Sequence, residues 1–199
     1  MAQITVKNLS FAYEGSHDLI FDRVSFQFDT DWKLGFIGRN GKGKTTFLRL
    51  LMGQEEYSGE ILSSGVQFDY FPFVVEEKER RALEVAEEIC PLLQLWQLQK
   101  ELSLLEVDEE ILYRPFSSLS NGEQTKLLLA VLFLRDNHFL LIDEPTNHLD
   151  RKGRSVVSKY LSRKNGFLLV CHDRAFLDEC IDHVLCINRA NIQVQQGNF

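Results

Sequence analysis

Residues 34–52 read LGFIGRNGKGKTTFLRLLM, and this stretch decides how the rest of the chain is interpreted. It contains Gly-x-x-x-x-Gly-Lys-Thr between Gly38 and Thr45, a pattern typical of a phosphate-binding P-loop. An apolar segment precedes the pattern as a buried strand would, and leucines at helical spacing follow it. The glycines let successive backbone N–H groups point at a polyphosphate, which the N-terminus of the following helix also attracts. A glycine-rich turn with an incidental Lys-Thr pair is the alternative, but the flanks favour a nucleoside triphosphate site. Lys44 would then reach the β- and γ-phosphates, and Thr45 would ligate Mg²⁺.

The bulk composition describes an ordinary globular protein of 199 residues, enough for one domain with a small appended lobe. A net charge of −7 argues against strong nucleic-acid binding by this domain alone, because a phosphate backbone requires a basic face. The four cysteines show no CxxC spacing, and we expect Cys171 and Cys186 to be reduced core residues. No apolar run approaches membrane-spanning length, and residues 1–5 do not resemble a signal peptide. We therefore expect a cytoplasmic protein without a membrane partner.

Hydrophobic patterning predicts an α/β fold with an inserted helical lobe. Alternating residues indicate strands at 3–13 and 24–28, and the turn between them favours an antiparallel pair. Two more strands are expected at 59–62 and 66–71, around a turn at 63–65. Continuous apolar runs at 138–142 and 166–171 are typical of central parallel strands. Charged, leucine-rich residues with helical spacing indicate that the lobe spans about 76–120.

Carboxylates stand where the apolar run at 138–142 ends, and ligands of open α/β sheets bind at such strand ends. We expect Asp143 to lie near Mg²⁺, opposite Thr45, and Glu144 to polarise the attacking water. His172 also follows a buried strand and could reach the γ-phosphate region. A lone histidine is more often a satisfied polar residue, but its place at the strand end favours a catalytic role.

Four motifs in a fixed order resemble the nucleotide-binding domain of ABC ATPases: 38–45, LSNGEQ at 119–124, LLIDEP at 140–145, and His172. The runs DEPTNHLD (143–150) and CHDRAFL (171–177) narrow the resemblance to the ABC-F group, soluble proteins with two such domains that act on ribosomes. YFPF at 70–73 is similar to ABC-F proteins that protect ribosomes from antibiotics. The resemblance covers essentially the whole chain. It implies a P-loop NTPase of the ABC ATPase type, with a mixed central sheet, an antiparallel β-subdomain and an inserted helical subdomain.

The resemblance also implies an ATP and Mg²⁺ site with assigned residues. The catalytic residues would be Lys44, Glu144 and His172, and the metal ligands Thr45 and Asp143. The residues expected to contact nucleotide are Tyr13, Gly38, Arg39, Asn40, Gly41, Lys42, Gly43, Lys44, Thr45, Thr46, Ser120, Asn121, Gly122 and Glu123.

Some of these residues have simpler interpretations. Tyr13 matches the adenine-stacking position of the family, yet Tyr13 and Phe11 could both be ordinary sheet aromatics. Ser120 and Glu123 fit a helix capping box.

Two positions depart from the family pattern. Asn121 replaces the first glycine of the usual Leu-Ser-Gly-Gly signature, although asparagine tolerates unusual backbone angles. Phe73 stands where an ABC domain has its Q-loop glutamine, which removes an amide that would help to bind Mg²⁺ or water. Phe73 could equally be a core aromatic of the helical lobe.

In ABC proteins the signature faces the P-loop of another domain, so we expect ATP to be sandwiched at an interface. The partner would be a second ABC domain of the same polypeptide, or a second copy of this chain. We expect residues 1–199 to be one nucleotide-binding domain, the N-terminal fragment of a two-domain protein that acts on the ribosome, and to hydrolyse ATP weakly alone. The alternatives are the ATPase motor subunit of an ABC transporter and a module that binds nucleotide without catalysis.

Overall fold

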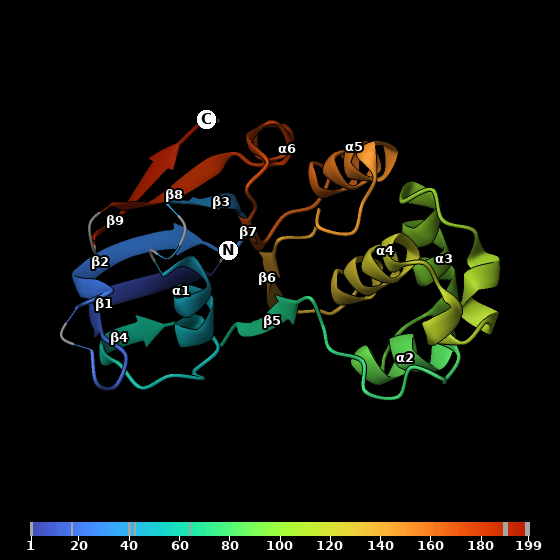
Figure 1. Cartoon of the computed structure of the whole chain (residues 1–199), viewed down its shortest axis with the longest axis horizontal. Coiled ribbons are helices and arrows are strands. Elements are labelled where there is room, and N and C mark those ends of the chain that lie inside the picture. The colour runs from blue at the N-terminus through green and yellow to red at the C-terminus, as the bar shows by residue number, and fades with distance from the viewer. Residues whose placement is uncertain are drawn as a thin grey trace.

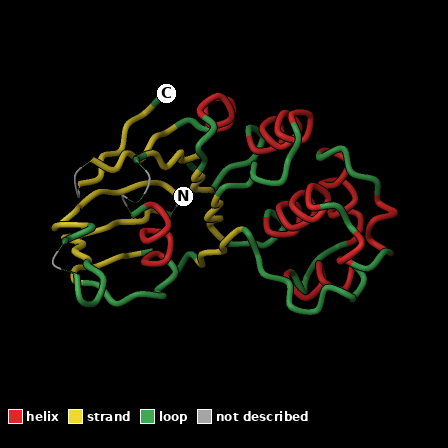
Figure 2. Tube along the Cα trace, viewed as in Figure 1, coloured by secondary structure: helices red, strands yellow, loops and turns green. Residues whose placement is uncertain are grey.

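The computed structural model describes residues 2–16, 18–39, 41, 43–63, 65–188 and 191–197. Strands and α1 occupy one half of the molecule, and α2–α5 occupy the other half (Figure 1). Figure 2 shows the same division by secondary structure. The strands are β1 (Gln3–Phe11), β2 (Phe21–Asp29), β3 (Lys33–Ile37), β4 (Ser58–Leu62), β5 (Gln67–Phe71), β6 (His138–Asp143), β7 (Phe167–Val170), β8 (His183–Asn188) and β9 (Asn191–Gln196). The α-helices are α1 (Lys44–Leu51), α2 (Ala82–Ile89), α3 (Leu95–Leu104), α4 (Asn121–Leu132), α5 (Arg151–Leu161) and α6 (Arg174–Cys180), with 3-10 helices at Glu109–Tyr113 and Phe116–Ser118.

The strands form two sheets. β1 pairs antiparallel with β2 and with β4 in a three-stranded sheet, which confirms the antiparallel pair expected near the N-terminus. The larger sheet has the order β5-β6-β7-β3-β8-β9, in which β9 alone runs antiparallel to its neighbour. Consecutive strands β4 and β5 therefore belong to different sheets. The mixed α/β architecture with an antiparallel sheet and a helical subdomain is confirmed.

The central strands β3, β6 and β7 of the larger sheet are buried on both faces, which explains their continuous apolar sequences. Phe139 and Leu141 face a cluster that includes α1 and the antiparallel sheet. Leu140 and Ile142 face the cluster formed with the helices that follow. This alternation along β6 fixes which side chains meet the P-loop at the end of the strand.

The helical subdomain is closed by α4, which packs against α2 and α3. α2 ends at Ile89, two residues before Pro91, because a proline interrupts a helix. α4 begins with the expected capping box between Ser120 and Glu123, and it ends at Leu132. Among the described residues, no helix combines the length and the apolar character needed to cross a membrane.

A buried polar network ties α3 to α5. Tyr160 donates a hydrogen bond of 2.6 Å from its hydroxyl to Oε2 of Glu101, and Lys164 Nζ lies 2.5 Å from the same oxygen. Lys164 also stands over the Tyr160 ring, 4.8 Å from its centroid. Because each charged group has a partner, the network links α3 to α5 without leaving a buried charge unpaired.

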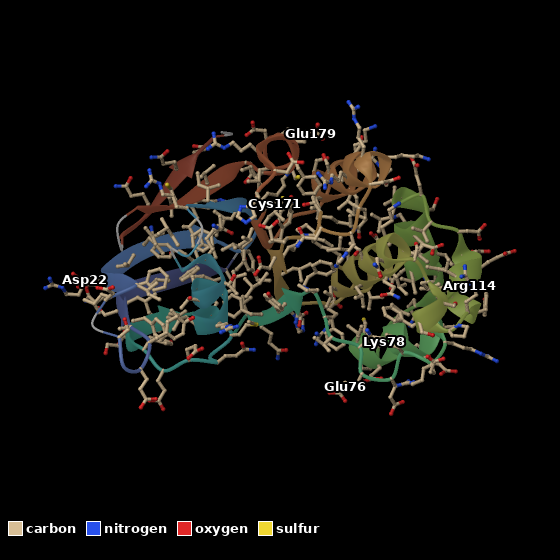
Figure 3. The ribbon with its side chains drawn as sticks, viewed as in Figure 1. Asp22, Glu76, Lys78, Arg114, Cys171 and Glu179 are labelled. Carbon is tan, nitrogen blue, oxygen red and sulfur yellow. The ribbon has the colours of Figure 1, made fainter. Side chains whose placement is uncertain are left out.

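The cysteines are free thiols. Cys171 is buried, as expected, but Cys186 is only half-buried because β8 lies near the edge of the sheet. Figure 3 labels Cys171 near the centre of the molecule, between the strands and the helices. The cysteines therefore differ in their access to solvent.

Candidate functional site

The P-loop joins β3 to α1, as the sequence predicts. Gly41 and Gly43 have φ angles of 72° and 97°, in the left-handed region that favours glycine. A Cβ at Gly43 would lie 2.4 Å from Cγ2 of Ile20, so the loop also requires glycine there for space. The loop opens into a cavity of about 370 Å³, lined by Tyr13, Ile20, Gly41, Gly43, Lys44, Thr45, Thr46, Asp143, Glu144, Val170 and His172. Most of the predicted P-loop and strand-end residues thus border one cavity.

Lys44 bonds to the P-loop itself in this structure. Its side chain is 8% exposed, and Nζ donates a 2.8 Å hydrogen bond to the carbonyl of Gly38. The carbonyl of Arg39 lies 3.5 Å away. A phosphate oxygen would therefore have to compete with these carbonyls for the ammonium group. Asn40 and Lys42, also predicted to contact nucleotide, lie outside the described residues.

Two hydroxyl groups converge on the carboxylate of Asp143. Thr45 Oγ1 donates to Oδ2 of Asp143 over 3.1 Å, and the Tyr70 hydroxyl donates to the same oxygen over 3.1 Å. A hydroxyl beside a carboxylate is the hard-oxygen environment that Mg²⁺ prefers, so the residues present fit the predicted metal. Sequence reasoning placed Thr45 and Asp143 together but missed Tyr70.

Glu144 and His172 stand next to each other above the end of β6. Oε1 of Glu144 lies 3.1 Å from Nε2 of His172. Burial raises the pKa of Glu144, and the neighbouring His172 opposes that shift. Glu144 also has a φ of 50°, uncommon for a residue with a Cβ, and its backbone N–H donates to the carbonyl of Val170. A raised pKa makes the carboxylate a stronger base, as activation of a water molecule requires.

Tyr13 borders the cavity and has an accessible ring. The side chain is 40% exposed, whereas Phe11 is 6% exposed and packs edge-on against it at 5.0 Å. The Tyr13 hydroxyl and Thr46 Oγ1 form a hydrogen bond of 2.9 Å. Of the two aromatic residues considered for adenine stacking, Tyr13 is therefore the one with a face open to a ligand.

The signature residues border a different cavity. Ser120, Asn121, Gly122 and Glu123 line about 410 Å³ at the start of α4. Ser120 Oγ donates to Oε2 of Glu123 over 2.7 Å, and this bond is the main cause of a lowered Glu123 pKa. In the part of the chain that the structure describes, this cavity and the P-loop cavity have no lining residue in common. The structure thus brings the P-loop, Asp143, Glu144 and His172 to one cavity. Asn121 of the signature also lines a further cavity that Asp143 and Glu144 border, but it does not line the P-loop cavity.

Phe73 belongs to the surface rather than to the core. It is 37% exposed, whereas Phe71 and Val75 on either side are buried. Phe73 lines a further cavity of about 370 Å³ together with Asp143 and Glu144. Of the two interpretations of this residue, the core aromatic is wrong. Phe73 thus places a phenyl ring in the same cavity as the two carboxylates.

The fold and the P-loop cavity together define the class of protein. It is an α/β domain of the P-loop type with a cavity suited to a nucleoside triphosphate. A family model described as "ABC transporter" matches residues 21–147, and the chain belongs to this family. The relatives place the domain with the ABC-F group. It is 26% identical to "ABC transporter F family member 5" of Arabidopsis thaliana, over 98% of this chain and 29% of that protein. It is 32% identical to "Ribosome protection protein VmlR" of Bacillus subtilis (strain 168), over 98% of this chain and 33% of that protein.

Transporter proteins are related as well. "Energy-coupling factor transporter ATP-binding protein EcfA1" of Thermotoga maritima is 29% identical over 96% of this chain and 80% of that protein. A solved structure described as a metal-chelate type ABC transporter in an inward-facing conformation superposes with a TM-score of 0.79 at 22% identity, covering 98% of this chain and 84% of that one. This likeness shows the ABC ATPase fold. The chain spans about a third of the length of the ABC-F relatives.

Proposed function

We propose that this domain binds MgATP and hydrolyses it to ADP and phosphate when paired with a second ABC domain. One observation carries the proposal. The cavity of the P-loop glycines is also bordered by Thr45 on α1, by Asp143 and Glu144 at the end of β6, and by His172 after β7. Membership of the ABC family supports the same substrate.

The residues then have distinct tasks. Lys44 would bind the β- and γ-phosphates after leaving the carbonyl of Gly38, and Tyr13 would stack on the adenine ring. Thr45 and Asp143 would hold Mg²⁺, which when bound neutralises charge on the phosphate oxygens. Glu144 would accept the proton of the attacking water, and His172, 3.1 Å away, would orient its carboxylate.

The pairing is supported by the lining of the P-loop cavity, which includes none of residues 119–124. Ser120, Asn121 and Gly122 would meet the nucleotide of the second domain, and the P-loop here would meet that domain's signature. The ABC-F relatives are about three times as long as this chain, which leaves room for a second domain in the same polypeptide. We therefore propose that an isolated copy binds ATP and turns it over slowly.

For the longer protein we propose action on the ribosome, in translation or in protection from antibiotics. The name of one relative, the 32% identical ribosome protection protein, supports this assignment. The alternative, an ATPase subunit of a transporter, is supported by the 29% identity to EcfA1.

Two measurements test these proposals. The first compares ATP binding and turnover in the native chain, Lys44→Ala and Glu144→Gln. We expect Lys44→Ala to weaken binding, and Glu144→Gln to bind ATP but lose turnover. Equal turnover in all three would refute the assignment of the site. The second measurement sediments the longer protein with ribosomes in ATP and in ADP. Sedimentation in ATP only supports the ribosomal role, and co-purification with a membrane protein instead supports the transporter alternative.

A further inference from the structure

The hydrogen bond from Tyr70 to Asp143 has no place in the site that the sequence motifs define. The Tyr70 hydroxyl donates to Oδ2 of Asp143 over 3.1 Å, the same distance as the bond from Thr45. The two donors come from different elements, because Thr45 lies in the first turn of α1 and Tyr70 lies in β5. They fix one carboxylate oxygen from two sides.

Strand register explains how Tyr70 reaches this carboxylate. β5 runs parallel to β6, with Tyr70 opposite Leu141. Side chains alternate along a strand, so Asp143 emerges on the same face as Leu141, two residues further on. The Tyr70 ring packs against the cluster that contains Phe139 and Leu141. Its ring is therefore held by apolar contacts while its hydroxyl points at the end of the neighbouring strand.

Three residues after Tyr70, Phe73 stands where the family resemblance implies a glutamine side chain. Phe73 lines a cavity with Asp143 and Glu144 but has no hydrogen-bonding group. Tyr70 thus supplies a polar contact to the carboxylates from the strand that leads to the Q-loop position. Partners of this kind fix the orientation of a metal-ligating carboxylate and affect metal affinity.

We propose that Tyr70 is a positioning residue for the Mg²⁺ site, whose hydroxyl holds the Asp143 carboxylate toward Thr45. The inference rests on the proposed function, since it concerns how the same site binds MgATP. On this proposal the Tyr70 hydroxyl contributes only to the part of the ATP affinity that depends on Mg²⁺. The phosphate contacts of the P-loop do not involve it.

The test measures ATP affinity in excess Mg²⁺ and in EDTA for the native chain, Tyr70→Phe and the control Tyr113→Phe. Phenylalanine keeps the ring and removes only the hydroxyl, and Tyr113 is 58% exposed in the helical subdomain. In Tyr70→Phe we expect the affinity gained from Mg²⁺ to fall about tenfold, the lower end for such partners, with ATP affinity in EDTA within about twofold of native. Tyr113→Phe should match the native chain in both conditions.

The outcomes separate the two proposals. If the native chain binds no ATP, the proposed function fails and this inference fails with it. If the native chain gains affinity from Mg²⁺ and Tyr70→Phe gains the same, only the positioning role is overturned. Equal losses with and without Mg²⁺, or a variant that does not fold by circular dichroism, would show that the hydroxyl is structural and would also overturn the inference.

Discussion

Gly43→Ala tests whether the shape of the P-loop requires glycine for both backbone and space. The native φ of 97° is costly for any residue with a Cβ, by about 1–2 kcal/mol. The added methyl would also lie 2.4 Å from Ile20 Cγ2 and 3.2 Å from Phe21 Cζ. Moving such neighbours costs about 1–3 kcal/mol more. We expect a total loss of about 2–5 kcal/mol in the free energy of unfolding.

Gly15→Ala is the matched control. Its φ is 79°, and no described atom lies within 4 Å of the position that its Cβ would take. It should therefore show the backbone cost alone, about 1–2 kcal/mol. For a domain of this size, 1 kcal/mol corresponds to about 2–4 °C in melting temperature. A difference of about 2 kcal/mol should place Gly43→Ala about 4–8 °C below Gly15→Ala.

Thermal unfolding followed by circular dichroism gives the melting temperatures, and a fluorescent ATP analogue gives the affinities. We expect ATP affinity to fall at least about tenfold in Gly43→Ala, because the backbone N–H groups no longer converge on the phosphates. Gly15→Ala should bind like the native chain. Equal melting temperatures, or native ATP affinity in Gly43→Ala, would refute the reasoning.

Three further predictions concern single side chains. Tyr160→Phe removes the hydrogen bond to the Glu101 carboxylate and should lower the free energy of unfolding in urea by about 1.5–3 kcal/mol. An unchanged unfolding midpoint would contradict a stabilising role for this hydrogen bond. Glu144→Gln should lower the turnover of the paired domain about 10²–10⁴-fold. Burial raises the pKa of Glu144 in the folded state, so its contribution to stability is present below its unfolded pKa and is lost as pH rises. The variant should consequently melt above native protein at pH 8, with a gap that narrows toward pH 4, and a gap independent of pH would count against this cause. Burial raises the pKa of the Cys180 thiol to about 12, so at pH 8 iodoacetamide should label half-buried Cys186 before Cys180. Mass spectrometry of the labelled protein measures the order, and early labelling of Cys180 would show that α6 opens.

The parts of the fold that sequence predicts are those with local signals. Glycine spacing and apolar flanks identify the P-loop, and the Ser120–Glu123 spacing identifies the start of α4. The allocation of β4 and β5 to different sheets depends on contacts with β1 and β6, far away in the sequence. Hydrophobic patterning shows which side chains of a strand share a face, but it does not show which strands pair with it.

The dependence on contacts between distant parts of the sequence also explains which residues of the site could be predicted. Asp143 could be predicted because it ends a recognisable apolar strand. Tyr70 could not, because its contact depends on the parallel register that sets it opposite Leu141. For Phe73 the sequence allowed the Q-loop position or a core aromatic of the helical lobe, and its exposure of 37% excludes the core. The nucleotide contacts of the signature stay predictions.

The separate cavities of the P-loop and of the signature have a kinetic consequence. If two copies of this chain must meet before ATP is cleaved, the rate in dilute solution grows with the square of the protein concentration. Two domains on one polypeptide would meet at a fixed local concentration, and their specific activity would not change on dilution. A dilution series therefore distinguishes a catalytic unit formed by collision from one formed by covalent linkage.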